Sequence, residues 1–365
     1  MGSSDEQKSS FSLHTKLSLL SIFVGGLFLI AVFATLFVTR EITVPIVIAI
    51  MLNFLLAPMV DQLKKIHIPS YIGAALLIAL FFFFTGLIFF KTFTYTANWL
   101  ATSPHNFPIA LHKFENLIQP IHRPITNLLR IKQKIEETTQ VVTTSKQKTI
   151  SVENSRLFES IFNNTQSFLF GMMLIVLLLY FLLISENFFL KKLIEALPNL
   201  EKKKDILVMM HLIQEQISLF LMLRVATGIM VALFTALILY ALQMPNAIIW
   251  GLVAGLLQFI PYFGILLGAI AITFTAILTF DNIWHIILIP AGFFLVDLLI
   301  DNIIFPILLS KKLVLHPVII LISVFFWGWL WGIPGTLIAV PIISIIKIIC
   351  QNIESLEPYS KFLGE

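Results

Sequence analysis

The sequence predicts an all-α protein that crosses a membrane several times. Hydrophobic residues make up 58% of its 365 residues and charged residues only 12%, whereas soluble domains average about 45–50% and about 25%. Apolar runs near 20 residues long recur along the chain, and a transmembrane helix needs about 20 such residues. A soluble enzyme or a nucleic-acid-binding protein is therefore not expected.

The first part of the chain divides into a tail, three spans and a polar segment. Residues 1–16 are polar and predict a cytosolic tail. Residues 17–100 predict a hairpin of two spans, 17–38 and 42–60, joined by a polar turn at Arg40-Glu41, and a third span whose helix continues to about residue 100. Residues 101–160 begin with four prolines and continue with a weakly amphipathic pattern, which indicates an extramembrane helical segment.

Residues 161–350 predict the core, in which two apolar pairs of helices are each interrupted by proline and glycine. A fourth span and a long helix, 206–242, precede the first pair, 246–280, which is broken around Pro261. A helix over 283–309 then precedes the second pair, 314–350, which is broken around Pro334. Each break either joins two crossing helices or forms the tip of a hairpin that does not cross. Residues 351–365 are a short polar tail.

The distribution of positive charge predicts the orientation. With the N-terminus inside, thirteen lysines fall in inner segments and only Arg40 falls in a short outer loop, as the positive-inside rule requires. The lysines are Lys8, Lys16, Lys64, Lys65, Lys191, Lys192, Lys202, Lys203, Lys204, Lys311, Lys312, Lys347 and Lys361. The basic segment before the long helix is then cytoplasmic and residues 101–160 are extracytoplasmic.

One pattern occurs twice in the C-terminal half: a helix followed by a broken pair. The prolines of the two breaks, Pro261 and Pro334, are 73 residues apart, and the same shift moves Arg224 onto Asp297. The orientation above makes the two units inverted in topology. Inverted repeats with interrupted helices are frequent in secondary transporters, which bind substrate between the repeats.

Two aspartates in an apolar helix are the main candidates for function. Asp297 and Asp301 share one helix face because they are four residues apart, and acids inside a membrane usually face a partner or a cavity. They could form a salt bridge with Arg224, act on an ion or a proton, or contribute to a metal site. Helix depth favours pairing Arg224 with Asp301, at about 10 Å and about 15 Å from the cytoplasmic side, and leaves Asp297 free.

Several short strings resemble the AI-2E (autoinducer-2 exporter-like) transporter family. They are Gly255–Gly264 (GLLQFIPYFG), Asp301-Asn302 with Pro306, Leu315-His316-Pro317, Gly332–Gly335 (GIPG) and Ala339-Val340-Pro341. The resemblance implies a bacterial inner-membrane protein with about eight crossing helices plus re-entrant hairpins. It also implies a homo-oligomer, with a pentamer as one candidate. Members of the family are linked to export of autoinducer-2 and, in some cases, to sodium–proton antiport.

We therefore expect a secondary transporter that exports a small polar solute or a signalling molecule such as autoinducer-2. A cation–proton antiporter and a membrane scaffold that transports nothing are the alternatives. The expected partners are the lipid bilayer, a small molecule or ion, and further copies of the chain, with no nucleic acid, cofactor, metal or catalytic residue. The expected path residues are Arg224, Gln258, Pro261, Gly264, Asp297, Asp301, Asn302, Pro306, Pro334 and Gly335.

Overall fold

The computed structural model describes residues 23–122, 154–185, 192, 200–309, 315–353 and 356–364. Within these ranges the chain is helical almost throughout and contains no strand, which confirms the all-α fold. The expected tail, residues 1–16, and the second half of the polar segment, 123–153, lie outside the described residues. The helices are α2 (Arg40–Lys65), α3 (Ser70–His122), α5 (Asn154–Ile184), α7 (Leu200–Ala241), α8 (Ala247–Leu257), α9 (Phe263–Thr279), α10 (Ile283–Leu299), the π-helix η1 (Ile300–Ile304), α11 (Phe305–Leu309), α12 (Pro317–Trp331), α13 (Ile333–Asn352) and α14 (Glu357–Leu363).

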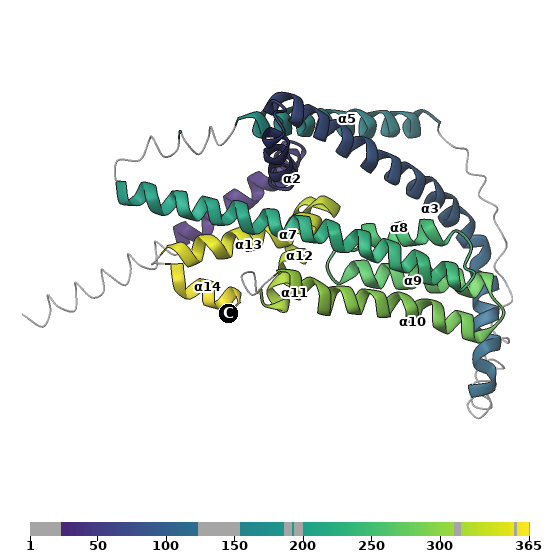
Figure 1. Cartoon of the computed structure of the whole chain (residues 1–365). Coiled ribbons are helices and arrows are strands. Elements are labelled where there is room, and N and C mark those ends of the chain that lie inside the picture. The colour runs from purple at the N-terminus through teal and green to yellow at the C-terminus, as the bar shows by residue number, and fades with distance from the viewer. Residues whose placement is uncertain are drawn as a thin grey trace, which may run out of the picture.

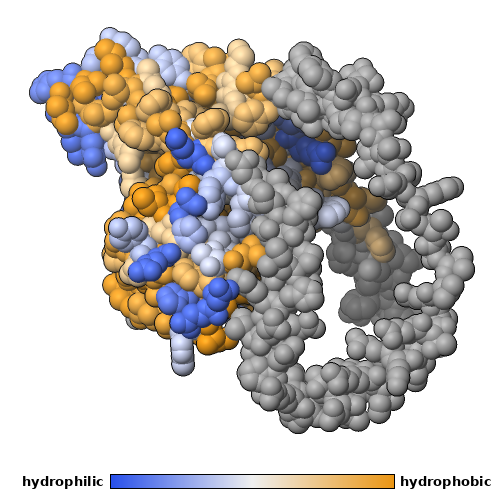
Figure 2. Space-filling model, turned by 90° about the vertical axis from the view of Figure 1, so that its right-hand side faces the viewer, coloured by the Kyte–Doolittle hydropathy of each residue, from blue (hydrophilic) through white to orange (hydrophobic). Residues whose placement is uncertain are grey.

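Five stretches of the described chain are long and apolar enough to cross a membrane. They are 40–65, 70–95, 203–241, 283–309 and 333–352, and shorter apolar helices cover 23–38, 168–184, 247–257, 263–279 and 317–331. Figure 2 shows broad hydrophobic areas on the viewed face of the molecule. Many large apolar side chains are exposed, such as Phe83 on α3 and Phe170 on α5. The chain is therefore a multi-pass membrane protein whose apolar surface suits lipid.

The expected polar turn at Arg40-Glu41 is wrong, because both residues lie in the first turn of α2. Only Thr39 separates the helix over 23–38 from α2. The N–H of Thr39 donates to the carbonyl of Thr35, and the N–H of Thr43 donates to the carbonyl of Thr39. Helical hydrogen bonds thus continue on both sides of Thr39, so the charges at Arg40 and Glu41 are accommodated at a helix start rather than in a loop.

Helix α3 is longer than the proline pattern predicts. It continues beyond residue 100 to His122 and spans 53 residues, or about 80 Å. Pro104, Pro108 and Pro120 lie inside it, although each proline removes one backbone donor. The boundary expected near residue 100 is therefore not a helix end. Figure 1 shows α3 crossing the bundle diagonally and passing beyond it.

Both broken pairs fold as antiparallel helical hairpins. In the first hairpin, α8–α9, Leu257 at the end of α8 lies against Gly264 at the start of α9. In the second hairpin, α12–α13, the Ser323 hydroxyl donates to the carbonyl of Ala339 at 3.1 Å. Helix α8 has only 11 residues and is about 16 Å long, which is far less than a hydrocarbon core of about 30 Å. The first hairpin therefore fits a re-entrant segment better than two crossings.

The helices α7 and α10 run antiparallel. Gly292, near the middle of α10, packs against Ile238 near the end of α7, while Asp301, after the end of α10, pairs with Arg224 near the middle of α7. Each helix is followed by one hairpin, so the two units follow opposite directions, as the predicted inverted repeat requires. Figure 1 shows α8 and α9 beside one half of α7 and α13 beside the other half.

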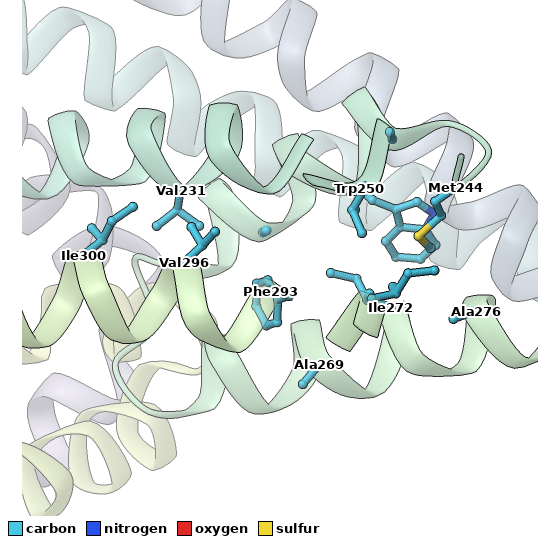
Figure 3. Close-up of a cluster of buried hydrophobic side chains, with 13 residues drawn as sticks. Val231, Met244, Trp250, Ala269, Ile272, Ala276, Phe293, Val296 and Ile300 are labelled. Carbon is cyan, nitrogen blue, oxygen red and sulfur yellow. The ribbon is translucent and has the colours of Figure 1, made fainter. Parts of the chain in front are cut away.

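Three buried clusters correspond to these parts. The first lies between α7, the first hairpin and α10, with Val231, Trp250, Ile272 and Phe293 among its members (Figure 3). A second joins α2, α3 and α5. The third joins α2, the first half of α7 and the second hairpin. The two hairpins thus cover different halves of α7.

Candidate transport site

The two hairpins meet beside Arg224 on α7, and we call this region of contact the seam. On one side of Arg224, Gly228 approaches Gly255 of the first hairpin. On the other side, Phe220 belongs to a cluster with Val340 of the second hairpin. The hairpins themselves touch, because the rings of Phe263 and Phe325 meet edge to face at 5.4 Å. The arginine therefore lies where both repeat units meet.

Arg224 forms an ion pair with Asp301. Its Nη1 donates to Oδ1 of Asp301 at 2.8 Å, and the two side chains are 11% and 31% exposed. The same carboxylate oxygen accepts a hydrogen bond from Nε2 of Gln258 at 2.5 Å. Gln258 follows α8 at the tip of the first hairpin and is buried. The pairing of Arg224 with Asp301 that helix depth predicts is confirmed, and Gln258 adds a link from the hairpin tip to the same acid.

The acid Asp301 lies on a π-helix, η1, between α10 and α11. The N–H of Phe305 reaches back five residues to the carbonyl of Ile300, and Pro306 has no N–H to donate. The carbonyl of Asp301 consequently lacks the donors that an α-helix or a π-helix would supply. π-helical turns occur frequently at functional sites. Pro306 thus creates an irregular backbone beside the ion pair.

The second acid, Asp297, lies one turn earlier on α10 and is buried, with 6% of its surface exposed. Within the described residues it makes neither a hydrogen bond nor an ion pair, although it lies within electrostatic range of Asp301 and Arg224. Two carboxylates therefore lie near one guanidinium, which pairs with Asp301. When both acids are ionised, the group carries one excess negative charge, which favours a cation or a proton beside Asp297.

An aromatic ring not expected from the sequence completes the surroundings of the arginine. The guanidinium carbon of Arg224 lies 5.2 Å from the centre of the Phe305 ring. Phe305 in turn meets Phe220 edge to face at 5.9 Å. Cation–π contacts of this kind stabilise a desolvated guanidinium. In a sequence with 34 phenylalanines, no local signal distinguishes this one.

The two break glycines occupy equivalent places in the two hairpins. A Cβ on Gly264 would collide with the carbonyl of Leu257, and a Cβ on Gly335 would collide with the carbonyl of Trp327. Both glycines are buried. Each therefore allows the second helix of its hairpin to start directly against the backbone of the first. Close packing, more than mobility, explains these two positions.

The tip of the first hairpin contains a strained turn. Tyr262 has φ 63° and ψ −44°, and the N–H of Phe263 donates to the carbonyl of Pro261 at 2.7 Å. This is a γ-turn of the rare and strained form. At the second break, Gly332 takes the positive φ of 69°. A bulky residue at positive φ persists only when its surroundings enforce it.

The remaining predicted residues lie at the edge of the group or apart from it. Asn302 is exposed, and its Nδ2 donates back to the carbonyl of Leu298 at 3.3 Å. Pro306 is exposed and Pro261 is half-buried. Pro334 and Gly335 start α13 and pack within the second hairpin. The structure thus brings together Arg224, Gln258 and Asp301, with Asp297 beside them.

Comparison with known proteins matches most of the chain to one family. The profile described as AI-2E family transporter matches residues 27–355. The chain belongs to the AI-2E transporter family. It shares 22% identity with a transport-protein homologue of Haemophilus influenzae over 97% of this chain and 99% of that protein, so the family match includes every element of the site.

Two other relatives share a higher identity with the chain, over a shorter part of it. The chain is 34% identical to "AI-2 transport protein TqsA" of Escherichia coli over 138 residues, which are 38% of this chain and 40% of that protein. A protein of Borreliella burgdorferi is 36% identical over 38% of this chain and 37% of that protein. The chain thus aligns with about two fifths of the length of these two relatives.

Proposed function

We propose that this AI-2E family member is a secondary transporter that exports a small polar solute or signalling molecule through the seam between its two hairpins. The observation that carries the proposal is the buried Arg224–Asp301 pair between antiparallel α7 and α10, which is bridged to a hairpin tip by Gln258. Charges at such depth are costly in lipid, and irregular backbone is tolerated there only in protein or beside a cavity. Autoinducer-2 is the first solute to test, because one relative is named for its transport.

Exchange of a cation for a proton is the second candidate. It is favoured by the surplus of acid: Asp297 and Asp301 face one arginine, and the carbonyl of Asp301 offers a further oxygen because Pro306 cannot donate to it. Oxygen ligands of this type suit hard cations such as sodium. The two candidates are compatible, since cation entry at Asp297 could drive solute export. A scaffold without transport activity would have no use for Asp297, a buried acid with no hydrogen-bond or ion-pair partner among the described residues.

Flux measurements in proteoliposomes test these proposals. The purified full chain is reconstituted, and uptake of autoinducer-2, of sodium and of protons is followed with and without an imposed sodium or proton gradient. An exporter moves the solute, and an antiporter acidifies or alkalinises the lumen only when a cation is present. Absence of all three fluxes, in vesicles where the protein is folded, contradicts both candidates.

The cellular setting is part of the proposal. We propose that the chain lies in the inner membrane of a bacterium, acts as a homo-oligomer and needs no cofactor. The family resemblance supports the location and the oligomer, which native mass spectrometry in detergent can count. A mass equal to one chain under mild conditions would contradict the oligomer without affecting the transport site, whose residues all come from one chain.

A further inference from the structure

The C-terminal helix α14 has three distinct faces. Ser360 is buried, at 5% exposure, and faces the rest of the chain. Glu357 and Lys361 form an exposed ion pair at 3.1 Å. Tyr359 and Phe362 are 64% and 77% exposed on a third side. At 100° per residue Tyr359 and Phe362 are about 60° apart, and together with Pro358, which lies beyond Phe362 on the helical wheel, they share an arc of about 100°.

The C-terminal end of α14 is tied to the base of the second hairpin. The carbonyl of Leu363, the last residue of α14, accepts a hydrogen bond from the N–H of His316 at 3.2 Å. His316 caps the start of α12, and its Nδ1 accepts the N–H of Val318 at 3.3 Å. The other end of α14 follows α13 after a few residues. Both ends of the short helix are thus fixed to the same hairpin.

We propose that α14 lies in the interface of the bilayer and anchors the base of the second hairpin there. Its aromatic face, formed by Tyr359 and Phe362, contacts the boundary between lipid headgroups and acyl chains. Tyrosine and other amphipathic aromatic residues favour that boundary, and the neighbouring ion pair Glu357–Lys361 stays in water. Ile353, just after the apolar helix α13, is also exposed at 39% and continues the apolar surface.

The position of α14, shortly after the membrane-spanning helix α13, favours lipid over a soluble protein as its partner. Helix α13 is apolar over 20 residues and ends at Asn352, so α14 begins close to where a span leaves the hydrocarbon. Amphipathic segments at that level place their apolar side into the interface and their charges outward. An anchored α14 would hold His316, and with it the entry of α12, at a fixed depth.

Spin labelling in lipid vesicles tests the proposal. Cys350, the single cysteine of the chain, is replaced in Cys350→Ala, and a nitroxide is attached in turn to Tyr359→Cys, Phe362→Cys and Lys361→Cys. We expect collision rates at 359 and 362 that are several-fold higher with oxygen than with a water-soluble nickel complex. The matched control at 361 should show the reverse preference.

Each other pattern overturns the proposal. Equal access of the nickel complex to positions 359, 361 and 362 would place the whole helix in water. Shielding of 359 and 362 from both reagents would place the aromatic face against protein, such as a second copy of the chain. Circular dichroism and retention of native size after reconstitution confirm that each labelled variant is folded.

Discussion

Arg224 and Asp301 are 77 residues apart in the chain, yet their side chains meet at 2.8 Å in the seam between two helical hairpins. The contact joins two antiparallel helices that come from opposite repeat units. Gln258 bonds the same carboxylate oxygen, so three elements converge on one acid. Any movement of the first hairpin relative to α10 must therefore break or rearrange bonds to Asp301.

Replacing this acid should destabilise the protein. Asp301→Asn leaves the guanidinium of Arg224 without its partner, and removal of one partner of a buried hydrogen bond costs about 1–3 kcal/mol. The exposed fraction of Asp301, 31%, argues for the lower part of that range. We expect a lower unfolding temperature in detergent, and partial recovery in the double variant Asp301→Asn with Arg224→Gln, which removes the orphaned charge.

The control for that experiment is Asp61→Asn, which removes an exposed partner of Lys64. Exposed pairs contribute about 0–1 kcal/mol, so this variant should unfold close to the wild type. Additive losses in the double variant at 224 and 301, with no recovery, would show that the pair is not a coupled unit.

The break glycines should tolerate no side chain. Gly264→Ala and Gly335→Ala each introduce a Cβ that collides with a backbone carbonyl, which cannot move aside as a flexible side chain can. We expect both variants to lose thermal stability as well as transport. Gly86→Ala is the matched control, because nothing lies within 4 Å of a Cβ there. Normal stability and flux in both hairpin variants would refute the packing argument.

Pro306, which follows the π-helix, should lower the stability of the fold while keeping the irregular backbone that transport needs. In Pro306→Ala the new N–H can bond a carbonyl of η1, which is worth about 1 kcal/mol net, so we expect a higher unfolding temperature. The same change regularises the backbone beside Asp301 and should reduce transport. Thermal unfolding and flux are measured on the same preparation. A variant that is stabilised yet transports normally would remove the functional reason for the irregular helix.

The orientation is tested by thiol labelling in intact cells. With Cys350 removed, single cysteines at Ser145 and Lys203 are exposed to an impermeant maleimide. Labelling from outside should occur at position 145 and not at position 203, because the basic segments favour the cytoplasm. The opposite result would reverse the topology.

Much of the architecture could be predicted from the sequence because lipid imposes simple rules. Long apolar runs must be helices, and the prolines at 261 and 334 divide each pair where the structure does. Counting 1.5 Å per residue from the helix ends predicts that Arg224 pairs with Asp301. These inferences need only helix geometry and the cost of charge in hydrocarbon.

The parts that sequence reasoning missed depend on tertiary packing. The short gap at Thr39 and the continuation of α3 through three prolines contradict local turn signals. Lys347, counted in a cytoplasmic loop from the sequence, is buried within α13. The γ-turn at Tyr262 and the contact of Arg224 with Phe305 have no sequence signature at all. Each is set by neighbours far away in the chain.

We propose that Asp297, a buried acid with no hydrogen-bond or ion-pair partner among the described residues, takes part in transport, and Asp297→Asn tests this role. The substitution keeps the shape of the buried side chain and removes its charge, so assembly and unfolding temperature should be maintained or improved. Solute and proton flux are measured in proteoliposomes beside wild type and Asp61→Asn, at equal amounts of reconstituted protein. We expect at least a tenfold loss of flux in Asp297→Asn alone. Full transport by Asp297→Asn would contradict this role.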